Sequence, residues 1–448
     1  MLSVSEASDR VADLVAAARR SGADAADAIY VGDGTTQVQV RLGQLEDVER
    51  SEGEEIGLRL FVGQRSASVS SSDLSSEALA ALVDRALAMA REAPEDPFAG
   101  LAPEDRLLRG TPVALDLDDG AALDPAALRT AALEAEDAAR AVQGVTNSQG
   151  TSASAGRATV AIATSHGFAA GYAASSYGLS ASVLAGQGGS MQRDYDYHSA
   201  RHHADLEAPS LIGRRAGERT VARMNPVRIA SGSMPVIFDP RVGSSFVGHL
   251  LGAISGASIA RRTSFLLDRL GDVIFASGIT VREEPHRLRG LRSRPFDGEG
   301  LPTTARAIID KGVLTTWLLD SASARQLAME PTGHATRGVG GPPGAGASNL
   351  HLEAGMLSRD ALMADVKRGI FVTELIGAGV NGVTGDYSRG ASGFLIEDGR
   401  IGPAVAEITI AGNLKDMFLA MTPADDLEFR NAVDVPTLRI DGMTVAGG

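Results

Sequence analysis

The sequence predicts an α+β protein with two domains. The N-terminal domain, residues 1–228, is predicted to be an α/β domain with helices on an antiparallel or mixed sheet, and the C-terminal domain, residues 229–448, to be mainly β. The first half contains long segments of helical periodicity with capping residues, and runs in which apolar and polar residues alternate as in strands. The second half is glycine-rich, with short apolar runs between turn signals. A chain of 448 residues also exceeds one ordinary core, which favours two domains.

Four helices and two groups of strands are predicted in the first half. Residues 25–73 alternate in "TQVQVRL" and "IGLRLFV", which predicts an antiparallel meander, and small residues alternating over 145–185 predict further strands. Ser75 or Ser76 is a suitable N-cap for one helix, and Asp124 followed by a proline is suitable for another. The four segments with helical spacing are residues 5–21, 75–92, 125–142 and 210–224.

The second half is predicted to begin with a strand, "MPVIFD", followed by a helix over residues 241–258. The segments "IIDKGVL" and "LIEDGRI" predict hairpins, because each places a turn sequence ending in Lys-Gly or Asp-Gly between apolar residues. The remaining short apolar runs are interpreted as strands of a mainly β domain.

Composition excludes several classes of function. The formal net charge is −14, which argues against a nucleic-acid-binding surface, because phosphate contacts require clustered Lys and Arg. The chain contains no cysteine, which excludes disulfides, thiolate metal ligands and cysteine nucleophiles. The first residues lack the pattern of a signal peptide, and no window approaches ~18 consecutive apolar residues. We therefore expect a cytoplasmic protein without a membrane partner.

Histidines are the first candidates for catalytic chemistry. A hydrolytic zinc site needs about three protein ligands and a nearby carboxylate as general base. The segment "FVGHLLGAISG" offers His249 alone, followed by Leu250, so a packed or capping histidine is favoured there. In "RDYDYHSARHH", His198 and His202 would share a helix face near two aspartates, Asp194 and Asp196, but the alternating tyrosines favour a strand or loop. A metal site at His198 and His202 is kept as an alternative.

Two further segments carry charged residues among glycines. In "RPFDGEG", Asp297 and Glu299 would share one face of an extended segment, where paired carboxylates can act in acid–base chemistry or bind a cation; a charged hairpin turn is the other interpretation. In "TGDYSRG", Arg389 is able to bind a carboxylate, or to form a structural pair with Asp386 within a tight turn.

Together these segments resemble a known family. "GHLLGAISGASIARRTSFLLDRLG", "RPFDGEG", "DKGVLTTWLLDSASARQL", "PTGHA", "VTELIGAGVNGVTGDYSRGASGFLIEDGRI" and "AEITIAGNLKDM" occur in this order between residues 233 and 416. They are similar to the C-terminal domain of the TldD/PmbA family, and more specifically to its PmbA (TldE) branch. The N-terminal half resembles the family more weakly.

The resemblance implies a cytosolic peptidase made of two homologous subunits that acts on small or unfolded peptides. The TldD-type subunit would carry the zinc on a helical His-Glu-x-x-x-His motif and a late cysteine. In this chain the first histidine of that motif matches His249, whereas Leu250 and Ile254 stand at the glutamate and second-histidine positions. The resemblance thus implies a degenerate metal-motif helix, no zinc and no catalytic residue in this chain, and a heterodimer whose TldD-type partner supplies zinc and general base.

Asp297, Glu299, Asp386 and Arg389 are then candidates for a peptide groove or a subunit interface. Two alternatives remain open. In the first alternative, the chain is a stand-alone peptide-binding or chaperone-like module. In the second, it is a self-sufficient metalloenzyme that uses His198 and His202.

Overall fold

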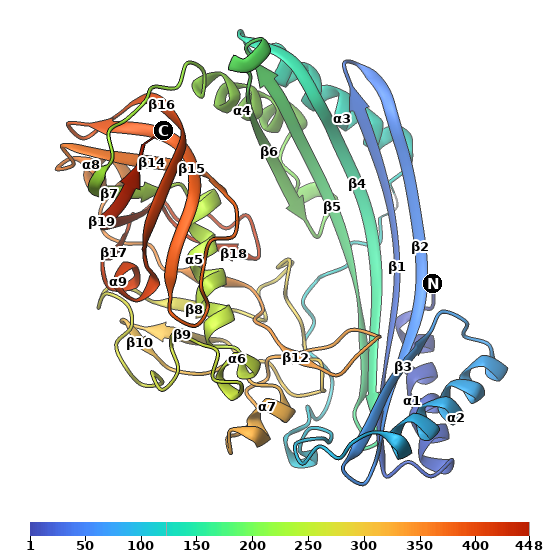
Figure 1. Cartoon of the computed structure of the whole chain (residues 1–448). Helices are drawn as coiled ribbons and strands as arrows, with labels where there is room; N and C mark the ends of the chain where they lie inside the picture. The colour runs from blue at the N-terminus through green and yellow to red at the C-terminus, as the bar shows by residue number, and fades with distance from the viewer. Residues whose placement is uncertain (122, 448) are drawn as a thin grey trace.

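The computed structural model describes residues 1–121 and 123–447. Its N-terminal part is one long antiparallel sheet with four helices (Figure 1). The strand order is β3-β2-β1-β4-β5-β6, and every neighbouring pair is antiparallel, so the mixed alternative does not apply. The strands are β1 (Ala25–Arg41), β2 (Gln44–Val62), β3 (Arg65–Ser71), β4 (Val145–Thr164), β5 (Ala169–Ala185) and β6 (Gln192–Ala200).

The four helices agree with the predicted segments and pack on one face of this sheet. They are α1 (Val4–Arg20), α2 (Ser76–Glu92), α3 (Pro125–Arg140) and α4 (Pro209–Ala222). Ser75 and Asp124 cap α2 and α3, since each side chain accepts a hydrogen bond from a backbone amide of the first turn. Two separate cores result, because α1 and α2 cover one end of the sheet and α3 and α4 cover the other. Residues 93–121 and 123, the described part of the segment 93–123, are irregular, as predicted, apart from a short 3-10 helix at Glu104–Arg106.

The opposite face of the sheet meets the C-terminal part of the chain. Alternation along β1 turns Ala28 and Tyr30 toward the helices and Ile29 toward the other side. There Ile29 joins a small core with Phe168 and with Phe296, which comes from the second half. The edge-to-face contact between Phe168 and Phe296, with ring centroids 5.0 Å apart, strengthens this junction.

The C-terminal part is built on a five-stranded barrel. Strands β16, β15, β14, β7 and β19 follow one another, and β16 closes the barrel by pairing with β19, with β17 added beside β19. Only β7 and β14 run parallel to each other among these neighbours. The bounds are β7 (Gly232–Phe238), β14 (Arg368–Ile376), β15 (Asp386–Glu397), β16 (Arg400–Asn413), β17 (Met421–Pro423) and β19 (Leu438–Ala446).

Smaller elements complete this part. This part also contains a second sheet, of order β10-β9-β8-β13-β18, and the two-stranded pair β11–β12. Both predicted hairpins are present, one between β9 and β10 and one between β15 and β16. The remaining elements are β8 (Val281–Glu283), β9 (Arg306–Asp310), β10 (Val313–Leu314), β11 (Ala335–Thr336), β12 (Gly344–Ala345), β13 (Leu350–Leu352), β18 (Val433–Asp434), α7 (Ser321–Gln326), α8 (Arg359–Met363) and α9 (Leu414–Leu419).

The helix predicted over residues 241–258 is two helices, which corrects that prediction. Helix α5 (Pro240–Ala253) ends at Ile254, and Ser255 caps the short α6 (Gly256–Ala260). The break is made by Leu318, whose backbone donates to the Ile254 carbonyl at 3.0 Å and accepts from the Gly256 amide at 2.8 Å. No helix in the described part of the chain is both long and apolar enough to cross a membrane.

Candidate functional site

Three hollows border helix α5 and define the candidate site. The charged hollow, of about 750 Å³, lies between the start of α5 and β6 and is lined by Arg241 and Asp196 among others. The arginine hollow, about 560 Å³, and the histidine hollow, also about 560 Å³, meet at Gly252 near the end of α5. Arg292 lines both the charged and the arginine hollow. The side of α5 away from the barrel core is therefore bordered by cavities from end to end.

His249 lies in the histidine hollow. It is half-buried, and its Nε2 is enclosed without a hydrogen-bond partner among the described residues. The ring of Tyr387 meets it edge-to-face at 6.0 Å between centroids. Burial, with a smaller contribution from the Arg389 charge, lowers the pKa of His249 below its usual value of 6.5. The imidazole is therefore neutral at pH 7 and free to donate or accept a hydrogen bond.

The residues beside His249 do not fit a zinc ion. Leu250 and Ile254 are both 0% exposed and belong to the large core between α5 and the barrel. They offer no donor atom, and the chain has no cysteine. Within residues 1–121 and 123–447, no three His, Cys, Asp or Glu side chains are grouped so that they could hold a metal. The core of this chain thus occupies the two positions where the TldD-type motif would place its base and second ligand.

Asp386 and Arg389 lie on β15 but do not form the structural pair considered above. Positions three apart on a strand point to opposite faces. Asp386 is exposed and accepts hydrogen bonds from Thr384 Oγ1 at 2.6 Å and from Asn413 Nδ2 at 3.1 Å, which lower the pKa of its carboxyl. Arg389 instead lines the histidine hollow, with its Nε enclosed and without a partner in the described structure. Arg389 and His249 are therefore the charged and polar groups of one cavity.

Asp297 and Glu299 lie inside the chain and do not line a groove, so that part of the prediction is wrong. Their exposed fractions are 2% and 3%. Asp297 forms a tight turn by accepting from the Glu299 and Leu301 amides, both at 2.9 Å. Glu299 accepts from the amide and the hydroxyl of Ser321 at 2.8 and 2.7 Å. The turn interpretation of "RPFDGEG" holds for Asp297, which accepts from amides of its own turn, whereas Glu299 is bound by Ser321, 22 residues farther along the chain.

Glu299 makes the stability of the chain depend on pH. Burial first, and then the charge of Asp297, raise its pKa from 4.5 to about 7. The folded state therefore binds the Glu299 proton more tightly than the unfolded state does. The stabilisation that this proton gives the folded chain is fully present below pH 4.5 and is lost as the pH rises to about 7. In urea titrations, the free energy of unfolding of the parent chain is expected to fall by roughly 3 kcal/mol between pH 4.5 and about 7 because of this group. The variant Glu299→Gln should not show that decrease. The exposed Glu134→Gln should keep the parent profile, and an unchanged slope in Glu299→Gln would contradict the assignment.

His198 and His202 do not form a metal site. His198 lies on β6 and accepts from the Glu207 amide at 3.2 Å, whereas His202 lies beyond the strand, 3.0 Å from the Asp116 carbonyl. The neighbouring aspartates are bound to arginines: Asp196 Oδ2 lies 2.6 Å from Arg215 Nε, and Asp194 Oδ1 lies 3.0 Å from Arg241 Nη1. The acidic groups that the alternative requires are already neutralised.

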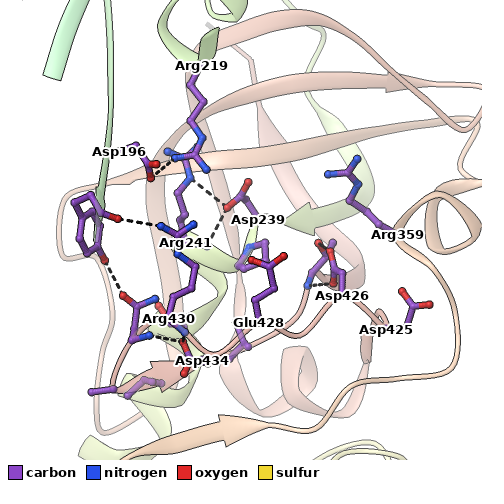
Figure 2. Close-up of a pocket in the computed structure, with 18 of the residues that line it drawn as sticks. Asp196, Arg219, Asp239, Arg241, Arg359, Asp425, Asp426, Glu428, Arg430 and Asp434 are labelled. Carbon is purple, nitrogen blue, oxygen red and sulfur yellow. Dashed lines mark hydrogen bonds and ion pairs between the residues drawn. The ribbon is translucent and has the colours of Figure 1, made fainter. Parts of the chain in front are cut away.

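The charged hollow is the place where these ion pairs join the two halves (Figure 2). Arg219 binds Asp196 at 2.8 Å, and Arg241 pairs with Asp239 of its own half. Arg241 also pairs with Asp194 of β6 at 3.0 Å. The Tyr197 hydroxyl adds a bond to Asn431 Oδ1 at 3.2 Å. Most of its charges are thus paired, and we interpret this hollow as a structural junction that positions α5 against the long sheet.

Sequence reasoning missed two sets of residues. One is the buried ion-pair cluster of Asp27, Arg59 and Arg337; the other is the group of arginines around the arginine hollow. Both combine residues that are distant in the sequence, and no local motif marks them.

Residues 26–90, 118–224 and 231–447 match the models of domain 1, the central domain and the C-terminal domain of the PmbA/TldA metallopeptidases. The chain is 39% identical to Metalloprotease PmbA of Escherichia coli O157:H7 over 97% of this chain and 94% of that protein. It is 25% identical to a TldD homologue of Haemophilus influenzae over 58% of each chain.

Solved structures share the whole fold. A crystal structure of a proposed modulator of DNA gyrase from Bacteroides thetaiotaomicron superimposes with a TM-score of 0.91 at 27% identity, covering 99% of both chains. The TldE structure from Thermococcus kodakarensis has a TM-score of 0.87 at 20% identity and covers 98% of this chain and all of that one. From the full-length identity and the three matching domain models, this chain belongs to the PmbA/TldD metallopeptidase family.

Proposed function

We propose that this chain is the PmbA (TldE)-type subunit of a cytoplasmic peptidase complex that processes small or unfolded peptides, and that it holds no zinc itself. The observation that carries the proposal is the burial of Leu250 and Ile254 in the core behind His249. A TldD-type homologous subunit would supply the zinc and the general base. Family membership and the relationship to TldD homologues support such a pairing, since homologous chains present related surfaces to each other.

The peptide would lie along α5, in the arginine and histidine hollows. Arg389 and His249 offer an unpaired guanidinium and a neutral imidazole in one cavity that no carboxylate lines. Such groups bind peptide carbonyl or carboxylate oxygens without cleaving the chain. Asp386, exposed at the start of β15, is then a candidate for the interface with the partner.

A stand-alone peptide-binding or chaperone-like module is the second candidate, because the same hollows would serve it. The metalloenzyme that uses His198 and His202 is not favoured, since Asp194 and Asp196 are bound to arginines.

Reconstitution distinguishes these candidates. We expect this chain, co-expressed with its TldD-type homologue, to purify as a complex of about one to one that cleaves unfolded peptides, while this chain alone cleaves none. A tagged version of either chain, with size-exclusion chromatography and mass spectrometry of the peptide products, provides the measurement. Cleavage by this chain alone after zinc is added would contradict the proposal, and peptide binding without any complex would favour the stand-alone module.

A further inference from the structure

The arginine hollow has a composition that the proposed function does not yet explain. It is lined by three arginines, Arg201, Arg292 and Arg294, and by neutral residues, without an aspartate or glutamate. Arg201 follows the end of β6, while the other two belong to the irregular segment before β9. In a chain with a formal charge of −14, three guanidinium groups thus converge on one cavity without a carboxylate.

Backbone carbonyls hold two of these guanidinium groups in place without neutralising them. Arg201 donates to the Ser175 carbonyl at 3.0 Å and to the Leu291 carbonyl. Arg294 donates to the Ala335 carbonyl at 3.1 Å and to the Gly346 carbonyl at 2.6 Å. The Nε of each is enclosed and has no partner among the described residues. The orientation of both side chains is therefore fixed before any ligand binds.

Their positive charges are not compensated within the described chain. None of the three forms an ion pair within 4.0 Å of a carboxylate oxygen there. The Arg294 charge partly offsets the burial that raises the pKa of Asp297, but the oxygens of Asp297 accept hydrogen bonds from backbone amides. Burial lowers the pKa of the Arg201 guanidinium, which is the direction expected for a cation that lacks an anionic partner. An anion in the hollow would compensate these unpaired positive charges.

We propose that the arginine hollow is a carboxylate-binding subsite that gives the complex a preference for peptides with an acidic group. This inference rests on the proposed function, because it assumes that the hollows along α5 receive the peptide. Planar guanidinium groups match the two oxygens of a carboxylate. The hollow shares Gly252 with the histidine hollow, and a Cβ added at that glycine would meet no atom within 4 Å, so the boundary between the two cavities is open on this side. The carboxylate is either an aspartate or glutamate side chain or the C-terminus of the peptide.

Three matched peptides test the subsite on the assembled complex. The parent is a fluorescent peptide of about ten Ala, Gly and Ser residues with one central Asp and a free C-terminus; the second has Asn at the centre, and the third has an amidated C-terminus. We expect the analogue that lacks the recognised carboxylate to bind about tenfold more weakly by fluorescence anisotropy, and to be cleaved with a correspondingly lower kcat/KM. The analogue that shows the loss identifies which carboxylate is bound.

Variants connect the preference to the hollow. Arg292 is exposed and forms no ion pair in the described structure, so Arg292→Gln should leave the melting temperature unchanged and weaken binding of the peptide that carries the recognised carboxylate to the level of the analogue that lacks it. Arg129→Gln, at an exposed position on α3, is the control and should keep the preference. Equal affinities for all three peptides, or a tenfold preference retained in Arg292→Gln, would overturn the inference. Carboxylate-dependent binding without cleavage would instead contradict only the proposed peptidase role, and cleavage without preference would contradict only the subsite.

Discussion

Replacing Leu250 with glutamate is expected to destabilise the chain by at least about 4 kcal/mol and to add no zinc. The Leu250 side chain is 0% exposed and packs in the core that α5 shares with the barrel. The substitution removes its buried methyl groups and places a carboxyl among apolar side chains, where no partner is available. A glutamate at this position, as in the TldD-type motif, is therefore expected to destabilise the fold without creating a zinc site.

Leu250→Met is the matched control, because a swap of similar volume in a core costs less than about 1.5 kcal/mol. Thermal and urea unfolding, followed by circular dichroism, measure both variants. The double variant Leu250→Glu, Ile254→His should likewise bind no stoichiometric zinc, since Ile254 is also 0% exposed. A Leu250→Glu protein that melts within a degree of the parent would show that this position does not belong to the core.

Replacing Asp27 with asparagine is expected to cost about 3 to 5 kcal/mol, the range for breaking a buried ion pair by removing one partner. Asp27 lies opposite Arg59 in the register of β1 and β2, with Arg59 Nε 3.1 Å from Asp27 Oδ2, and it also pairs with Arg337. All three side chains are buried. Without the carboxylate, two guanidinium charges would remain in the interior, with Glu299 of the same cluster 4.0 Å from Arg59.

This substitution should also weaken the arginine hollow. Arg337 follows β11, whose Thr336 lines that hollow, so the Asp27–Arg337 pair anchors one wall of the cavity to the long sheet. Asp33→Asn is the control, because Asp33 is exposed on the same strand. We expect that control to change the free energy of unfolding by less than about 0.5 kcal/mol. Equal stability of the two variants in urea titrations would contradict the role of the cluster.

Local features were the ones that could be predicted from the sequence. The caps at Ser75 and Asp124 act on amides within three residues, and the hairpin turns at Lys311–Gly312 and Asp398–Gly399 connect strands that follow each other directly in the sequence. The degenerate motif at His249 followed from the resemblance to the TldD/PmbA family, which is carried by short segments of sequence. These signals depend on short stretches of chain, so no knowledge of packing was required.

Features made by distant residues could not be predicted. The end of α5 is set by Leu318, which lies 64 residues after Ile254, so periodicity alone extended the helix too far. The burial of Asp297 and Glu299 depends on amides of Ala335 and Ser321, and their charged, glycine-rich context suggested exposure instead. Arg201 and Arg294 converge on one hollow only because β6 passes beside the segment before β9. Each of these outcomes was decided by tertiary packing.

Zinc content is the most direct test of the central claim that this chain contributes a peptide-binding surface but no metal. The complex with the TldD-type homologue and the separately purified chain would be dialysed against excess zinc and then against buffer, and analysed by inductively coupled plasma mass spectrometry. We expect about one zinc per heterodimer and none on this chain, with an unchanged value when His249 is replaced by alanine. Near-stoichiometric zinc on the isolated chain, lost in His249→Ala, would contradict this claim.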